Sequence, residues 1–302
     1  MHVSRRDFVK TVGLGAGMGL LPGLTMAKKG LAALPATSGN NRGKAMLYDS
    51  TRCVGCRACQ TACKQWNSLP AESIGYGGIY DNPRSLSAQT WTLIKARDIT
   101  TNGEKDLLLC KYQCMHCTEA ACVKVCPTHA LTYHPLGFVS YDENICSGCG
   151  YCTEFCPFQV PHLAGSMVTG VQRMNKCTFC QDRVPDGRQT ACAEACPAGA
   201  ILYGNREELI AEGKKRAISL KSAYPNALLY GESELGGLHV MYVLKEASTI
   251  YQLPEYPKVP PAALAWKDVM QPLGWALGAM TILGLGLNYL VVRASHKSGK
   301  EI

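Results

Sequence analysis

The sequence lacks the motifs of an enzyme that carries out chemistry on its own. It has no glycine-rich nucleotide-binding loop beside an expected strand, no nucleophile elbow and no paired carboxylates at catalytic spacing. The C-x-x-C-H motif of covalently attached haem is also absent, because other residues follow the C-x-x-C pairs, among them Gln60, Thr118, Thr153 and Gln181. These absences exclude c-type cytochromes and argue against an active site within this chain.

The middle of the chain has little excess charge of either sign. The formal net charge is +8 at pH 7, but many of the basic residues that produce it lie near the two ends. These terminal residues are Arg5, Arg6, Lys10, Arg293, Lys297 and Lys300. A nucleic-acid-binding domain needs a concentrated basic patch or stripe. We therefore expect no nucleic-acid partner.

Cysteine, by contrast, is abundant and regularly spaced. Four sets of four account for all but one of the 17 cysteines: Cys53, Cys56, Cys59 and Cys63; Cys114, Cys117, Cys122 and Cys126; Cys146, Cys149, Cys152 and Cys156; and Cys177, Cys180, Cys192 and Cys196. The first and third sets have the spacing C-x2-C-x2-C-x3-C, which is typical of [4Fe–4S] clusters. A proline follows sets two to four, whereas Lys64 follows set one. Four ligands per cube predict four [4Fe–4S] clusters.

Zinc and disulfides explain this pattern less well. Structural zinc sites usually take cysteines as two separated pairs, and cysteines two residues apart on a turning loop are poorly placed to bridge each other. A zinc-bound scaffold without electron-transfer function is the alternative from another class. Cys110, at the end of the apolar run "DLLLC", is expected to be a buried free thiol. Because the clusters would form much of the core, folding should depend on metal loading.

Residues 1–27 are expected to form a twin-arginine signal peptide. The stretch "SRRDFVK" (4–10) precedes a glycine-rich apolar segment that extends to Met26. A basic anchor helix is the alternative, but the glycines of this segment and Pro22 weaken a stable membrane span. The twin-arginine route exports folded proteins, which suits a protein whose clusters are inserted in the cytoplasm.

Residues 273–292 are expected to form a transmembrane helix. The segment "LGWALGAMTILGLGLNYLVV" has no charged residue, and at about 1.5 Å per residue it spans a hydrocarbon core of about 30 Å. The residues that follow, 293–302, are basic and are expected to form a cytoplasmic tail, which places the cluster body on the periplasmic side. We therefore predict a single-pass protein of the inner membrane. A buried helix of a soluble protein is the alternative.

The middle of the chain indicates an α+β fold. Cysteine runs alternate with short strand signals around a glycine turn, as in "CPTHALTYHPLGFVSYDENIC", which predicts two bacterial-ferredoxin-like modules over 46–205. An insert, 64–113, interrupts them and contains an expected strand at 89–99. Residues 206–271 are expected to contain an amphipathic helix, a strand and a proline-rich linker. Their expected bounds are 206–224, 238–244 and 251–263.

The four cysteine sets resemble those of the four-cluster β subunits of membrane-bound molybdenum and nickel oxidoreductases. Other stretches are similar to the iron–sulfur (β) subunit of the respiratory formate dehydrogenases of the N/O type, from about Met46 to the end of the membrane helix. They are "YDNPRSLSAQTWT" (80–92), "CPFQVPHL" (156–163), "KCTFCQDRV" (176–184), "GGLHVMYVLKEA" (236–247) and "AWKDVMQPLGW" (265–275). The resemblance implies two partners: a molybdopterin-type catalytic subunit with molybdenum or tungsten that oxidises formate, and a cytochrome b subunit that reduces quinone. This chain would be a non-catalytic electron carrier between them.

One feature departs from that family. In its best-known members the catalytic subunit carries the export signal, whereas here "SRRDFVK" lies on the iron–sulfur chain itself. The iron–sulfur subunit of hydrogenase-2-type [NiFe] hydrogenases has this arrangement of signal, four clusters and C-terminal helix. The alternative function is therefore electron transfer from the large-subunit complex of a periplasmic [NiFe] hydrogenase.

The resemblance also implies how the cysteines are shared. In ferredoxins the last cysteine of each run ligates the other cluster of the module, and the family pairs set one with set four and set two with set three. The implied ligand sets are Cys53, Cys56, Cys59 and Cys196; Cys63, Cys177, Cys180 and Cys192; Cys114, Cys117, Cys122 and Cys156; and Cys126, Cys146, Cys149 and Cys152.

Overall fold

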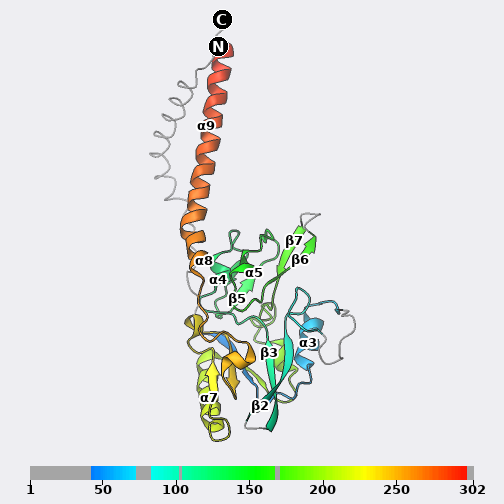
Figure 1. Ribbon diagram of the computed structural model, residues 1–302. Helices are drawn as coiled ribbons and strands as arrows, with labels where there is room; N and C mark the ends of the chain where they lie inside the picture. Colours follow the sequence, from blue (N-terminus) through cyan, green and yellow to red (C-terminus); the bar gives the residue numbers. More distant parts are fainter. Residues whose placement is uncertain (1–41, 73–82, 102–103, 167–170, 298–302) are drawn as a thin grey trace. The chain divides into compact units, whose positions relative to one another are not determined.

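The computed structural model describes residues 42–72, 83–101, 104–166 and 171–297. The expected signal peptide and the end of the expected tail, 298–302, lie outside the described residues. The chain divides into two compact units, a body that extends to Ala263 and a helical unit that begins at Leu264. Figure 1 shows both units.

A four-stranded sheet forms the base of the body, with the strand order β8-β1-β10-β9. Its strands are β1 (Lys44–Asp49), β8 (Ile201–Asn205), β9 (Leu228–Tyr230) and β10 (Val240–Leu244). The central strands β1 and β10 are parallel, with Met46 opposite Val240, and both edge strands are antiparallel to their neighbours. The sequence predicts a strand over 238–244 but none at β1 or β9, and only the structure shows that these strands form one sheet.

Both faces of this sheet are buried, which explains the nearly continuous apolar sequence of β1. Successive side chains of a strand point to opposite faces. Ala45 and Leu47 pack under helix α7 (Arg206–Leu220), whereas Met46 and Tyr48 belong to the main core that contains several cluster-loop cysteines. The helix expected over 206–224 thus ends at Leu220 and covers one face, leaving the other for the cysteine loops.

The cysteine runs alternate with short helices and hairpins. The helices are α3 (Ala58–Trp66), α4 (Ala121–Lys124), α5 (Tyr151–Glu154) and α6 (Ala191–Glu194). The hairpins are β2–β3 (Leu93–Thr101 and Glu104–Tyr112), β4–β5 (Leu131–Tyr133 and Val139–Tyr141) and β6–β7 (His162–Ser166 and Val171–Asn175). Each helix contains at least one cysteine of a run, and β4–β5 lies between the second and third runs. The arrangement is that of ferredoxin-like modules with additions.

The β2–β3 hairpin occupies the insert, and its first strand begins later than predicted. The sequence predicts a strand over 89–99, but Thr90 N–H donates instead to the Ser87 hydroxyl oxygen at 3.0 Å. Because of this local turn, pairing between β2 and β3 begins only at Leu93, which lies opposite Tyr112. Cys110, on β3, is a buried free thiol.

The segment after β10 remains attached to the body. Two short 3₁₀ turns, Glu234–Gly236 and Ser248–Tyr251, flank the strand. In the proline-rich stretch beyond them, Leu253 is buried and the carbonyl oxygen of Pro254 accepts a hydrogen bond from the Tyr230 hydroxyl at 2.7 Å. The expected linker is therefore extended, and these two contacts hold it against the surface of the body.

The C-terminal unit is a long helix with an irregular start. Helix α8 (Pro261–Ala265) contains the boundary between the two units, and a π-helical turn (Trp266–Met270) and α9 (Gln271–Lys297) follow it. Helical structure therefore begins before Leu273, the first residue of the expected transmembrane helix. Pro272 lacks an N–H group and would disrupt a regular helix at this point, and the π turn directly before it accommodates that loss.

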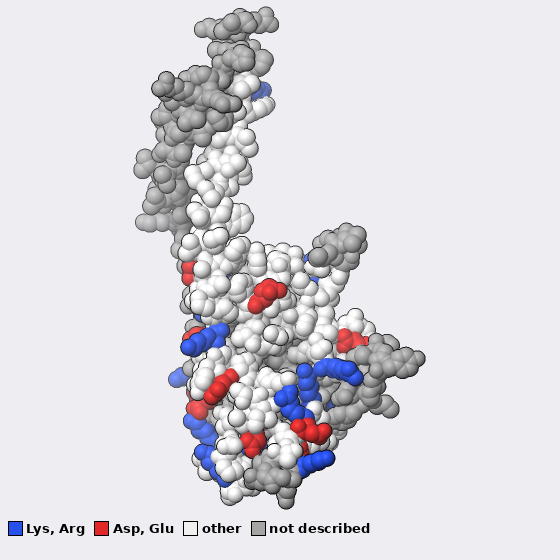
Figure 2. Space-filling model, viewed as in Figure 1, with Lys and Arg blue, Asp and Glu red and all other residues white. Residues whose placement is uncertain are grey.

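Helix α9 has the length and composition of a membrane-spanning helix. Within the helical stretch Pro261–Ser295, an 18-residue window has a mean hydropathy of 1.7, and no residue of that window is buried within the described chain. Figure 2 shows α9 without charged side chains until the basic residue near its C-terminal end. A helix of this kind suits a membrane anchor.

Candidate iron–sulfur cluster sites

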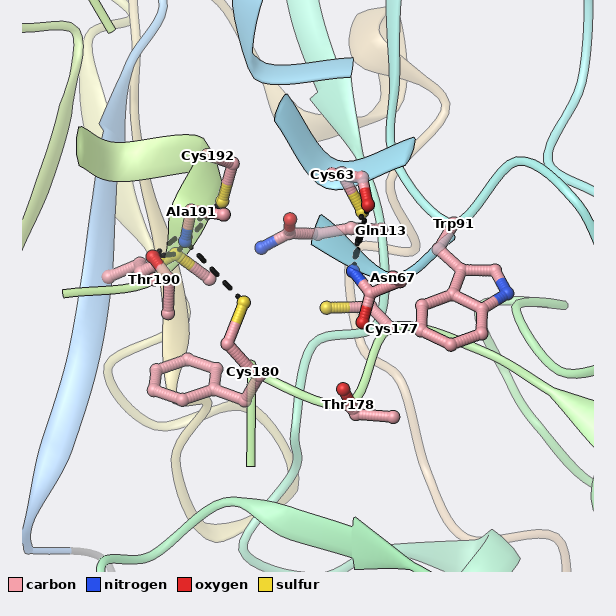
Figure 3. Close-up of a pocket in the computed structure, with 12 residues that line it drawn as sticks. Cys63, Asn67, Trp91, Gln113, Cys177, Thr178, Cys180, Thr190, Ala191 and Cys192 are labelled. Atoms are coloured by element: carbon pink, nitrogen blue, oxygen red, sulfur yellow. Dashed lines mark hydrogen bonds between the residues drawn. The ribbon is translucent and has the colours of Figure 1, made fainter. Parts of the chain in front are cut away.

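Three cavities in the body are each lined by four cysteines. Site I is lined by Cys53, Cys56, Cys59 and Cys196; site II by Cys63, Cys177, Cys180 and Cys192; and site IV by Cys126, Cys146, Cys149 and Cys152. Each set combines cysteines of two different runs. At site II, α3 supplies one thiol, α6 another and the loop after β7 the remaining two (Figure 3).

The remaining four cysteines also lie together and form site III. Cys114 and Cys156 belong to one small buried cluster. Burial raises the pKa of Cys117 well above its usual value, and the neighbouring thiols of Cys114, Cys156 and Cys122 raise it further. The four groupings are the sets that the family resemblance implies. Their assignment as ligands stays a prediction.

A left-handed backbone residue shapes all four cysteine loops. It lies directly before the second cysteine of each run, and the four residues are Gly55, His116, Gly148 and Phe179, with φ values of 69°, 48°, 69° and 61°. This conformation turns the chain sharply, so that both cysteines of a C-x-x-C pair can point into one cavity. The two glycines adopt it without strain. The same turn at His116 and Phe179 was not evident from the sequence, because these side chains do not favour it.

The cysteine sulfur atoms are placed so that a positively charged metal could bind them as thiolates. All 17 cysteines lie in the described residues, and each is a free thiol. Burial raises the pKa of Cys59 and of Cys177 to about 12, and that of Cys180 to about 11. Such thiols stay protonated at neutral pH unless a metal stabilises the thiolate. Iron of a [4Fe–4S] cluster supplies that stabilisation.

The arrangement does not suit single zinc ions. A structural zinc site brings four ligand atoms to within about 2.3 Å of one point. Within the described ranges, no group of three or more His, Cys, Asp or Glu side chains converges in a way that would hold one metal ion. The cysteines instead surround cavities, as a larger polynuclear group requires.

Buried lysines provide a second test of fit. Lys111 and Lys176 are each about 1% exposed, and neither forms a salt bridge with a carboxylate in the described part of the chain. Burying an ammonium group without a countercharge is costly. Anionic clusters beside these lysines would provide the missing negative charge. Sequence reasoning missed both residues, although a lysine within the apolar run "LLLCKYQC" was a usable signal.

Site II has additional donors that point at its sulfur atoms. The Asn67 side chain donates from Nδ2 to the Cys63 carbonyl oxygen at 2.8 Å and lies 3.6 Å from Cys63 Sγ, and the backbone N–H of Ala191 donates to Cys180 Sγ at 3.4 Å. Figure 3 shows these contacts together with the Gln113 side chain, which also lines the cavity. Hydrogen bonds to sulfur stabilise thiolates and tune the potential of a cluster.

The four sites follow one another through the body. Cys59 of site I and Cys192 of site II share the main core, sites II and III meet where Cys177 packs with Cys114, and sites III and IV meet at Cys122 and Cys152 in a further buried cluster. Cysteines are exposed only at the two ends of this series. They are Cys56 at site I and Cys149 at site IV.

A buried series of cysteine-lined cavities with two exposed ends defines the class of this protein, an iron–sulfur electron-transfer protein. Residues 105–206 match the family described as 4Fe-4S dicluster domain. That match includes the cysteines of runs two to four and supports ferredoxin-like modules with [4Fe–4S] clusters.

The curated relatives define the family more narrowly. The "Formate dehydrogenase, nitrate-inducible, iron-sulfur subunit" of Escherichia coli (strain K12) is 38% identical over 251 residues, covering 82% of this chain and 84% of that protein. The "Formate dehydrogenase-O iron-sulfur subunit" of the same strain is 36% identical over 281 residues, with coverages of 91% and 92%. This chain belongs to the family of formate dehydrogenase iron–sulfur subunits.

A hydrogenase-associated protein is also a relative. The "Hydrogenase-2 operon protein HybA" of Escherichia coli O157:H7 is 34% identical over 322 residues, covering 93% of this chain and 94% of that protein. The family resemblance seen in the sequence is thus confirmed. Relatives of this chain are named for formate dehydrogenase and for hydrogenase-2, the two enzyme systems that the sequence suggested.

Proposed function

We propose that this chain carries electrons through four [4Fe–4S] clusters from a periplasmic, formate-oxidising molybdenum or tungsten subunit to a membrane cytochrome b and quinone. The observation that carries the proposal is the series of four cysteine sites with exposed residues at its two ends. Formate dehydrogenase relatives support formate as the electron source. The chain itself performs no bond chemistry.

In this proposal, each bound cluster supplies a one-electron redox centre. The protein's residues hold that centre, keep water away from it and set its charge environment. Sites II and III lie among buried side chains such as Phe179 and Val160, which exclude solvent. The loops at Cys56 and Cys149, with Val54 and Ile145 exposed beside them, form the contact points for the two partner subunits.

The ligand assignment has a sharp test because it groups cysteines from different runs. Cys53→Ala and Cys196→Ala should remove the same cluster signal in electron paramagnetic resonance (EPR) spectra of the reduced protein. Cys63→Ala and Cys192→Ala should both remove a second, different signal. If each run held its own cluster, Cys53 and Cys63 would instead share a phenotype, and that result would overturn the assignment.

We propose further that the body lies on the periplasmic side of the inner membrane and that α9 anchors it. The uncharged segment 273–292, the basic residues after it and the twin-arginine motif at Arg5 and Arg6 support this orientation. A cysteine added at the C-terminus should resist a membrane-impermeant thiol reagent in intact spheroplasts, and external protease should digest the body. Labelling from outside would contradict the orientation.

A [NiFe] hydrogenase partner is the second candidate, supported by the HybA relative and by the export motif on this chain. The two candidates differ in the electron donor. In membranes containing the intact complex, formate should bleach the cluster absorption in the first case and hydrogen in the second. The metal content of the co-purified partner, molybdenum or tungsten against nickel, is an independent measurement.

A further inference from the structure

Lys111 carries a buried charge between two cysteine sites. It lies near the end of β3, its side chain is about 1% exposed, and its Nζ donates a hydrogen bond to Gln113 Oε1. Gln113 is equally buried and lines the cavity of site II (Figure 3). Because the amide of Gln113 is neutral, it orients the ammonium group without cancelling its charge.

The neighbours of Lys111 belong to both sites of one module. Burial lowers the pKa of Lys111, but the nearby sulfur groups of Cys192, Cys59, Cys177 and Cys63 offset this effect and the pKa is raised. Cys59 lines site I, and the other three line site II. In the β2–β3 hairpin, Lys111 pairs with Ile94, which lines the cavity of site I, while its hydrogen-bond partner Gln113 lines the cavity of site II.

Other buried cations near the cysteines are differently placed. Lys176 donates to the carbonyl oxygens of Val139 and Cys177, at 3.1 and 3.0 Å, and acts on Cys122 of site III. Arg183, beside site II, forms an ion pair with Glu194, which offsets its charge. Lys111 forms no salt bridge within the described ranges, and its charge is directed at sites I and II.

We propose that Lys111, oriented by Gln113, raises the reduction potentials of the clusters at sites I and II. Reduction adds one negative charge to a cluster, and a fixed positive charge close by favours the reduced form. A charge within about 10 Å, at an effective dielectric constant of about 20, changes such an equilibrium by more than tenfold. This inference rests on the proposed clusters. In this role, the charge of Lys111 raises the potentials of the two clusters, and Lys111 itself binds no metal.

The test is an EPR-monitored redox titration of the full-length protein with its clusters. In Lys111→Met, the equilibrium between the oxidised and reduced forms of two clusters should shift at least tenfold towards the oxidised form. For a one-electron couple this shift makes each midpoint potential more negative by about 59 mV. Lys111→Arg, which keeps the charge, should titrate close to the wild type. The matched control is Lys105→Met, because Lys105 is an exposed lysine on the same strand and its loss should shift nothing.

The outcomes separate this inference from the proposed function. Iron and acid-labile sulfide analysis of the wild-type protein tests the clusters themselves. If a fully loaded Lys111→Met protein titrates like the wild type, or if Lys111→Arg shifts as far, the role of Lys111 is refuted while the clusters stand. If Lys111→Met does not load, Gln113→Glu provides the test, because it leaves Lys111 in place and adds a countercharge beside it. That variant should lower the same two potentials, and unchanged potentials would overturn the inference.

Discussion

Replacing Asp49 with alanine should destabilise the body and loosen the first cysteine loop. Asp49 ends β1, four residues before Cys53, and is about 2% exposed. Its Oδ2 lies 3.0 Å from Arg216 Nη1 of helix α7, and its Oδ1 accepts hydrogen bonds from the Thr51 N–H at 3.0 Å and hydroxyl at 2.6 Å. The Asp49 carboxylate thus links helix α7 to strand β1 and stabilises the turn that leads to the first cysteine run.

The size of the effect follows from these contacts. Removing one partner of a buried ion pair costs about 3–5 kcal/mol, and Arg216 keeps a second partner in Glu212, at 2.7 Å, so the lower half of that range applies. Each lost hydrogen bond to Thr51 adds about 1 kcal/mol. Asp49→Asn keeps an acceptor for Thr51 and loses only the charge, so its cost should be about 1.5–3 kcal/mol.

The assay is anaerobic thermal unfolding at a fixed scan rate, followed by circular dichroism and by loss of the cluster absorption. For a unit of this size, 1 kcal/mol shifts Tm by about 2–4 °C. Asp49→Ala should therefore cost about 5–6 kcal/mol and lower the apparent Tm by roughly 10–20 °C, and the cluster absorption should fade before the helix signal. Asp49→Asn should lie between Asp49→Ala and the wild type.

A matched control lies on the same helix. Glu207 forms a well-exposed ion pair with Arg42 at 3.3 Å, and exposed pairs contribute about 0–1 kcal/mol. Glu207→Gln should therefore leave the apparent Tm almost unchanged. The reasoning fails if Asp49→Ala unfolds with the wild type, or if Glu207→Gln destabilises the protein as much.

Further predictions concern other parts of the chain. Cys110→Ser should leave the iron content unchanged, because this buried thiol lines none of the described cysteine cavities; a loss of iron would make it a ligand. Gly137→Ala should destabilise the body by about 1–3 kcal/mol or more, since its Cβ would lie 2.1 Å from His239 Cε1, whereas Gly199→Ala meets no atom within 4 Å and should cost less; equal unfolding temperatures would contradict this. A chain ending at Pro272 should appear in the soluble fraction with its cluster absorption intact, and membrane retention would show that α9 is not the anchor. Anaerobic removal of iron by a chelator should abolish near-ultraviolet circular dichroism, because buried thiols and Lys111 would lose their countercharges; a retained spectrum would refute metal-dependent folding.

The chemistry of this protein was predictable from local sequence because cluster ligands obey short-range rules. Thiols within a few residues of one another, on loops that turn at Gly55 and Gly148, are specified by spacing and by residue type alone. The same holds for the long apolar helix, whose length and absence of charge suffice to suggest a membrane span. Helix α7 was evident from its pattern, and only its end, at Leu220, differed from the expectation.

The residues that surround the cysteines could not be found in this way. Strand β1 was missed because its four apolar residues, Ala45 to Tyr48, show no alternation with polar residues, since both faces of the strand are buried. The late start of β2 depends on a turn that Ser87 forms with Thr90, which competes with the sheet ladder. Left-handed turns at His116 and Phe179 oppose the intrinsic preference of those residues, so they are imposed by the packing around them.

The sequence by itself predicted which cysteines would hold the clusters, and the tertiary structure alone decided how the four cysteine runs are brought together. Runs that are more than a hundred residues apart share a cavity because β1 pairs with β8 on one side and with β10 on the other, so that Tyr48 lies opposite both Ile201 and Tyr242. Such pairings depend on the collective burial of apolar faces, which no local pattern encodes. The same long-range packing places Lys111 among cysteines of the first and fourth runs, where its charge acts on both sites.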